Sequence, residues 1–284
     1  MDYTLKELKL PYNISYSKIN LFKDCKNKFY FNYLSEFSVP KRTWSTAVIG
    51  TAMHSTVEYF IGKLPVENIN KKFASELQEY FMNVYKEQVT EAKKNTQYKR
   101  TNGWSEKKYT EVAEKQIPLL CEFINRVYNY PSKDELLSEM DLTIPFEYND
   151  KINVTGKVDL VYIVDDQLVS FGDLKTTKNA SNFWYVDWEN NFQKMIYEYM
   201  LLKEVGSFPK RFEYIVSNYL ERVAFTKDCY TIVDNYDKYF LSLRAIIDEM
   251  WEFINNPDFV QATSNWCHVC EYKEICPAGG YCGK

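Results

Sequence analysis

Residues Ile152–Thr177, INVTGKVDLVYIVDDQLVSFGDLKTT, carry the pattern from which the central sheet of this 284-residue chain is predicted. Apolar and polar residues alternate on both sides of Asp165 and Asp166, and this period of two predicts two strands joined by a hairpin. Residues two apart on a strand share a face, so Asp173 and Lys175 project together. The second strand therefore ends with an acid and a lysine side by side.

The length of the hairpin loop decides whether a second acid joins them. With a three-residue loop over 165–167, Val164 pairs with Leu168 and Asp159 faces Asp173. A two-residue loop would place the two aspartates on opposite faces of the sheet. The three-residue loop gives a coherent apolar face that ends in two carboxylates, and we predict it for that reason.

Two carboxylates that face each other on an apolar sheet repel, and a bound cation relieves the repulsion. Mg²⁺ prefers oxygen ligands and keeps water molecules, one of which can attack a phosphodiester. Lys175 could orient this water and neutralise the charge that develops in the transition state. In the alternative interpretation, Asp159 and Asp173 only form ion pairs with Lys157 and Lys175.

Two predicted helices carry further candidate site residues. His54 and Glu58 are four residues apart on a helix predicted over 46–62, and an imidazole there would shift a carboxylate site toward Mn²⁺. The same histidine could be a packing or surface residue. Gln193 and Tyr197 are also four residues apart, on a helix predicted over 188–204, where an amide and a phenol could bind a phosphate or a base.

The rest of the chain predicts an α/β fold with a central mixed β-sheet flanked by helices. Helical periodicity runs over 15–34, 65–130 and 231–255, and strand alternation begins at Asp141 and returns after the hairpin at 211–220 and 223–225. The predicted parts are N-terminal helices at 1–64, a helical insertion at 65–140, the sheet with its helices at 141–255, and a cysteine-rich segment at 256–284.

Four motifs follow one another in the chain: GTAMH at 50–54, GKVD at 156–159, DLK at 173–175 and QKMIY at 193–197. This series resembles the PD-(D/E)XK nuclease superfamily. It is most similar to the RecB-like branch, which includes the nuclease domains of RecB and AddB and the single-domain nucleases of CRISPR adaptation. The opening SYSKINLFKDCKNKFYFNYL at 15–34 also resembles that branch, whereas residues 65–140 match none of its motifs.

The resemblance implies a restriction-endonuclease-like core and assigns a role to each motif. His54, Asp159 and Asp173 would bind Mg²⁺ or Mn²⁺. Lys175 would be catalytic together with the two aspartates. Gln193 and Tyr197 would contact DNA near the scissile phosphate.

Four of the seven cysteines crowd the C-terminus, which indicates a metal rather than disulfides. By ligand type, thiolates suit zinc and iron-sulfur clusters equally. A zinc site would use Cys267, Cys270, Cys276 and Cys282. Iron-sulfur members of the RecB-like branch hold a [4Fe-4S] cluster with one cysteine before the core and three after it, which implies Cys25, Cys267, Cys270 and Cys276.

The net charge of −4 does not indicate a polyanionic partner, so a nucleic-acid site must be a local patch. The N-terminus carries charges where an export signal needs an apolar stretch, and no apolar run is long enough to span a membrane. We expect a cytoplasmic protein, associated with the nucleoid or acting in an infected host cell. The chain has no GxxxxGK[ST] loop, so any ATP-driven motor must come from a separate helicase or recombination partner.

The resulting hypothesis is a metal-dependent DNA exonuclease or end-processing nuclease that hydrolyses phosphodiester bonds on single-stranded DNA ends. Recombination, repair, phage DNA metabolism and CRISPR adaptation are the settings that the resemblance suggests. The alternative is a catalytically silent module that keeps the fold and binds DNA or inhibits a nuclease-helicase.

Overall fold

A computed structural model gives the structure of residues 5–37, 39, 42–61, 71–95, 97–99, 105–128, 135–164, 167–177, 179–183, 185–218, 223–230, 233, 235–258, 267 and 270–277.

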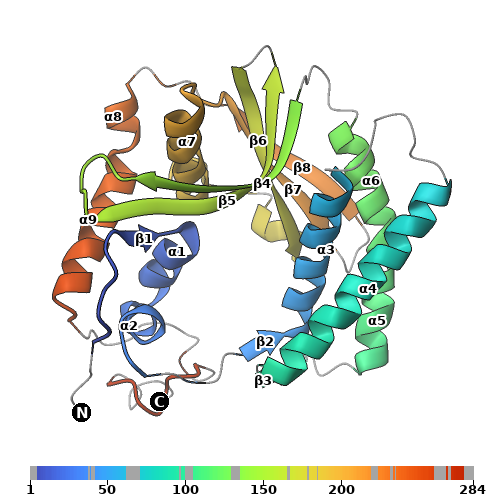
Figure 1. Cartoon of the computed structure of the whole chain (residues 1–284), viewed down its shortest axis with the longest axis horizontal. Coiled ribbons are helices and arrows are strands. Elements are labelled where there is room, and N and C mark those ends of the chain that lie inside the picture. The colour runs from blue at the N-terminus through green and yellow to red at the C-terminus, as the bar shows by residue number, and fades with distance from the viewer. Residues whose placement is uncertain are drawn as a thin grey trace.

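A six-stranded mixed sheet forms the centre of the molecule (Figure 1). β4 and β6 run antiparallel to β5 on its two sides, β7 is parallel to β6, and β8 is antiparallel to β7. The short β1 is parallel to the start of β5. The strands are β1 (Tyr12–Ile14), β4 (Glu135–Pro145), β5 (Ile152–Val164), β6 (Gln167–Thr177), β7 (Arg211–Asn218) and β8 (Val223–Tyr230). The predicted mixed sheet is confirmed.

Helices cover both faces of the sheet (Figure 1). On one side lie α1 (Tyr16–Asp24), α2 (Lys26–Tyr33), α7 (Phe192–Val205), α8 (Tyr236–Tyr239) and α9 (Leu241–Asn255). On the other side lie α3 (Ser45–Ile61), α4 (Lys71–Asn95), α5 (Glu106–Glu114) and α6 (Ile117–Tyr128). Each group buries its own apolar core against the sheet. None of the helices that the structure describes is both long enough and apolar enough to cross a membrane.

The register between β5 and β6 corrects the predicted hairpin in one detail. Near the turn Val164 pairs with Gln167, so the loop has two residues and not three. The register then shifts by one residue, because Val169 forms a bulge in β6. Beyond the bulge the pairs are those that the longer loop predicts: Leu160 with Gly172, Val161 with Phe171 and Tyr162 with Ser170. The bulge supplies the residue that the shorter loop omits, so Asp159 still lies beside Asp173.

Several boundaries differ from the prediction. The helix expected over 15–34 breaks at Cys25, whose backbone is extended and whose Sγ accepts a hydrogen bond from the Lys28 amide at 3.4 Å. β4 begins at Glu135 rather than at Asp141. Its first residues do not alternate strictly between apolar and polar, so the sequence pattern did not reveal them. The helix expected over 231–255 divides into α8 and α9. The insertion contains β3 (Gln97–Lys99), which pairs with β2 (Arg42–Trp44).

Two glycines allow helices to approach the sheet closely. A Cβ atom at Gly50 would lie 2.8 Å from Thr176 Oγ1, so α3 packs tightly on β6. A Cβ atom at Gly156 would lie 2.9 Å from Met200 Cε and 3.1 Å from a ring carbon of Tyr197, so α7 packs tightly on β5. These two contacts bring α3 and α7, the helices of the first and last motifs, to the acidic part of the sheet.

Candidate active site

Three acidic residues lie side by side on three neighbouring strands: Glu139 on β4, Asp159 on β5 and Asp173 on β6. The pairs Ser138–Leu160 and Met140–Val158 flank Glu139 and place it opposite Asp159. Glu139 has a φ of 55°, a left-handed conformation that is uncommon for a residue with a side chain. We call these three residues the acidic row.

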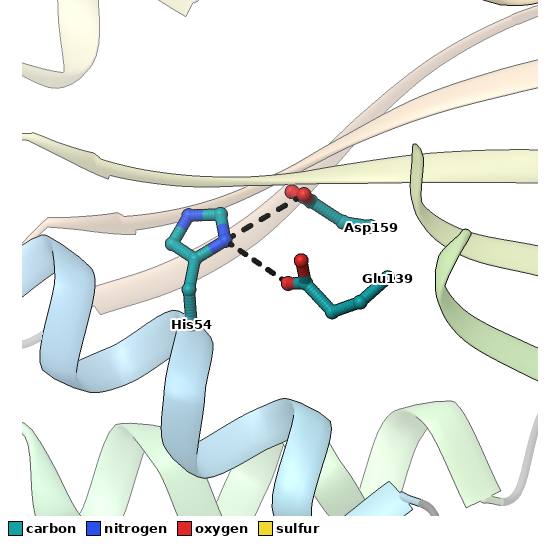
Figure 2. A group of neighbouring side chains, drawn as sticks. All are labelled: His54, Glu139 and Asp159. Carbon is teal, nitrogen blue, oxygen red and sulfur yellow. Dashed lines mark ion pairs between the residues drawn. The ribbon is translucent and has the colours of Figure 1, made fainter. Parts of the chain in front are cut away.

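His54 reaches the acidic row from α3 (Figure 2). Its Nδ1 lies 3.6 Å from Glu139 Oε1 and 3.6 Å from Asp159 Oδ1. Burial alone would lower the pKa of His54, but hydrogen bonds to the two carboxylates and their charges outweigh it and raise the pKa to about 10. Without a metal, a protonated imidazole therefore supplies positive charge between the two acids.

Asp173 is the most deeply buried member of the row, with 4% of its side chain exposed. Lys175 Nζ lies 2.6 Å from Asp173 Oδ2, and Gln193 donates a hydrogen bond to Asp173 Oδ1 at 2.5 Å. Burial raises the pKa of Asp173, and the charge of Asp159 adds to this effect, whereas Lys175 opposes it. The predicted acid and lysine of the DLK motif thus form one ion pair.

Gln193 and Tyr197 lie behind Asp173 rather than on the surface. The Gln193 amide also donates to the Tyr197 hydroxyl at 3.2 Å, and Tyr214 donates to Gln193 Oε1 at 3.1 Å. Burial raises the pKa of Tyr197. In this structure the predicted substrate-binding pair therefore positions a carboxylate, and a contact with DNA stays a prediction.

Glu139 is the residue that the sequence analysis missed. Lys157 Nζ lies 2.5 Å from Glu139 Oε2, and its second acidic partner is Glu58 at 3.7 Å. Burial would raise the pKa of Glu139, but His54 and Lys157 outweigh it and lower the pKa. Lys157 thus pairs with Glu139 and Glu58 instead of Asp159. The start of β4, ELLSE, is mixed in polarity, so its pattern did not single out Glu139.

Each acid in the row uses one oxygen to bind a donor that holds it in place. Asp159 Oδ2 accepts a hydrogen bond from the Leu174 amide at 2.7 Å, Asp173 Oδ1 binds Gln193, and Glu139 Oε2 binds Lys157. The other oxygens of Glu139 and Asp159 point to His54 (Figure 2). The strand ladder and these donors therefore fix the row before any cation binds.

His54, Glu139 and Asp159 form a donor set that fits a divalent cation. Asp173, which was also predicted as a ligand, is not part of this group, and its oxygens lie against Gln193 and Lys175. Ligand atoms of His54, Glu139 and Asp159 all lie within 4.8 Å of one another. Within the residues that the structure describes, no other three metal-ligating side chains meet this condition. Carboxylate oxygens suit Mg²⁺ and Mn²⁺, and an imidazole nitrogen favours Mn²⁺.

Residues 270–277 of the cysteine-rich segment pack on α2 (Figure 1), and Cys270 lies close enough to Cys25 for their charges to interact. Asn27 donates a hydrogen bond to Cys276 Sγ at 3.5 Å, Lys28 pairs with Glu271 at 3.2 Å, and the ring of Tyr272 stacks on α2. The structure therefore brings Cys25 and the segment that contains Cys270 and Cys276 to the same region. Cys282, which the zinc alternative requires, lies outside the described residues.

A comparison with protein-family models agrees with the site. The family model described as "PD-(D/E)XK nuclease superfamily" matches residues 13–277. A search of curated proteins found no match. A solved structure titled "Crystal structure of SSO0001" is similar at a TM-score of 0.36 and 13% sequence identity, over 92% of this chain and 95% of that chain. The family match includes the whole acidic row, His54 and Lys175, and the chain belongs to the PD-(D/E)XK nuclease superfamily.

Proposed function

We propose that this protein is a metal-dependent DNA exonuclease or end-processing nuclease of the RecB-like branch, acting on single-stranded DNA ends. The observation that carries the proposal is the acidic row, with His54 at one end and the Asp173–Lys175 ion pair at the other. Membership of the nuclease superfamily supports hydrolysis of a phosphodiester. The choice of DNA and of single-stranded ends rests on the resemblance of the four motifs.

His54, Asp159 and Asp173 would hold Mg²⁺ or Mn²⁺, and the structure adds Glu139 as a fourth candidate ligand. When bound, the cation would activate a water molecule and neutralise charge on the phosphate. Binding would replace the proton on His54, because the raised pKa keeps the imidazole charged at neutral pH in the absence of metal. The two acids that raise this pKa are those that would bind the cation.

Lys175 would act on the phosphate itself. Its side chain is 28% exposed, whereas Asp173 next to it is buried, so the ammonium group lies between the acid and solvent. A fixed ammonium group stabilises the negative charge that develops as the phosphodiester is attacked. Gln193 and Tyr197 keep Asp173 in place, so the lysine has a defined position.

Cys25, Cys267, Cys270 and Cys276 are proposed to hold a [4Fe-4S] cluster that joins α2 to the C-terminal segment. The contacts of residues 271–276 with α2 support this proposal. Such a cluster would close a long loop around the sheet and stabilise the fold without taking part in catalysis. Zinc on Cys267, Cys270, Cys276 and Cys282 is the alternative.

The setting is proposed on the same resemblance. A cytoplasmic nuclease without a motor would act beside a separate helicase or recombination partner, in recombination, repair, phage DNA metabolism or CRISPR adaptation.

A nuclease assay on end-labelled single-stranded and double-stranded DNA tests the proposal. The wild-type protein should shorten single strands with Mg²⁺ or Mn²⁺ and should be inactive in EDTA. Binding of the same single strands without cleavage, with either metal, would instead support the catalytically silent module.

A further inference from the structure

The connection between β6 and α7 joins the strand of Asp173 and Lys175 to the helix of Gln193. Tyr185 lies in this connection, and 93% of the residue is exposed. The next most exposed large apolar residue that the structure describes is Leu10, at 56%. Within the described part of the chain, Tyr185 has no hydrogen bond or ring contact. The position of Tyr185 between the strand of Lys175 and the helix of Gln193, more than its exposure, indicates a functional role.

Residues on both sides of Tyr185 fix the connection to the sheet. The ring of Phe183 meets the ring of Tyr214 edge-on at 5.4 Å, and the ring of Trp188 stacks on Tyr214 at 5.6 Å with an interplanar angle of 22°. Trp188 also contacts Phe212 at 5.8 Å. Tyr185 therefore extends from a short segment that is packed at both ends.

Local hydrogen bonds also order the chain on both sides of Tyr185. Asn179 Oδ1 accepts hydrogen bonds from the amide and the hydroxyl of Ser181, at 3.2 Å and 2.6 Å. Asp187 accepts two hydrogen bonds from Asn190, at 3.2 Å and 2.8 Å. A preformed segment loses little conformational entropy when a ligand binds to it.

One aromatic ring connects the anchors of Tyr185 to the catalytic site. Lys175 Nζ lies 5.6 Å from the centre of the Tyr214 ring, on which Phe183 and Trp188 pack. The Tyr214 hydroxyl donates to Gln193, which holds Asp173. Tyr185 thus belongs to a connection whose anchors pack on the ring that lies beside Lys175.

We propose that Tyr185 is a stacking platform for an unpaired base of single-stranded nucleic acid, beside the scissile phosphate. The inference rests on the proposed function and adds a residue that selects the substrate. Every base has a π face, so stacking on a tyrosine ring is tolerant of sequence. Bases in a duplex already stack on one another, so the platform favours single strands.

Binding and cleavage of single-stranded oligonucleotides test the platform. Tyr185→Ala should weaken binding of oligo(dT) in EDTA, and raise KM with Mn²⁺, by about 5- to 100-fold. Tyr185→Phe keeps the ring and should stay close to wild type. Tyr236→Ala is the matched control, because Tyr236 is a 45% exposed tyrosine on α8. Tyr185 is so exposed that its replacement should not affect folding.

A series of oligonucleotides with one abasic position each identifies the stacked base. In the wild type, an abasic site at one particular position should lower the affinity several-fold. In Tyr185→Ala the affinity should no longer depend on where the abasic site lies. Equal affinity of wild type and Tyr185→Ala, or the same abasic profile in both, would overturn the platform. If the wild type shows the predicted binding pattern but no cleavage, the nuclease proposal fails and the platform stands. If it cleaves single strands and Tyr185→Ala does so with the same KM, the platform alone fails.

Discussion

The acidic row and the cysteine-rich segment are the two regions proposed to bind metals, and they are built differently. The row lies on three strands whose ladder fixes the spacing of the acids, and donors such as Leu174 and Gln193 hold individual oxygens. The cysteines come from a helix junction and a C-terminal segment in which the described residues 270–277 form turns. The row is therefore formed in the absence of a cation, whereas the proposed cluster would have to join the cysteines. Variants in the two regions should accordingly affect different properties.

Replacing Lys175, the ion-pair partner of Asp173, should give the largest effect, and on catalysis alone. Lys175→Ala leaves the acids and His54 in place, so DNA and metal should still bind while turnover falls by about 10²- to 10³-fold. The measurement is single-turnover cleavage of labelled single-stranded DNA. Lys203→Ala, which removes a surface ion pair with Glu147, is the matched control. Cleavage by Lys175→Ala at the wild-type rate would remove this lysine from the mechanism.

A change in the cysteine region should act on stability instead. Cys25→Ser should lose bound iron and lower the Tm by at least about 5 °C, because the cluster no longer joins α2 to the C-terminal segment. Iron analysis and thermal unfolding of protein purified without oxygen measure this effect. Cys121→Ser, which changes a half-buried thiol on α6, should retain the iron. Full iron content in Cys25→Ser, or zinc in the wild type, would contradict the cluster assignment.

Replacing Glu139 tests whether the metal site includes the third strand of the row, β4. Glu139→Gln keeps the shape of the side chain but removes a charge that faces His54, so the affinity for Mn²⁺ should fall by about tenfold or more. Glu58→Gln is the control, because Glu58 is the other, half-exposed partner of Lys157. Titration of metal-free protein with Mn²⁺ measures the effect. Equal affinities for wild type and Glu139→Gln would exclude Glu139 as a ligand.

The smallest expected effect concerns the protonation of His54. In metal-free protein the pKa of His54 is raised to about 10, above the ordinary value of 6.5. The stabilisation from the charged imidazole is therefore complete below pH 6.5 and is lost as the pH rises through about 10. NMR titration of the two histidines in EDTA measures this pKa, and Glu139→Gln should lower it. Titration of His54 near pH 6.5 would mean that the acids do not hold the proton.

Local patterns were enough to find Asp159, Asp173 and Lys175. Strand alternation predicts which residues share a face, and the order of the four motifs added His54. The β-bulge at Val169 was not predictable, because it depends on how the strand packs and not on the turn residues alone. Asp159 and Asp173 still face each other, because the extra residue of the bulge compensates for the shorter loop.

Glu139 could not be found from the same patterns. Its place opposite Asp159 depends on the register between β4 and β5, and its left-handed backbone turns the side chain out of the ordinary alternation. Strands β1, β2 and β3 have three residues each, too short for a periodic signal. Features set by long-range pairing therefore required the structure.

The central claim is that the acidic row and His54 bind a divalent cation. Anomalous diffraction from crystals soaked in Mn²⁺ tests it most directly, because it locates the metal without relying on activity. We expect a peak bound by His54, Asp159 and at least one of Glu139 and Asp173, with Lys175 beside it. A peak elsewhere, or no peak while Lys157 and His54 keep their contacts with Glu139, would exclude a cation site at the acidic row.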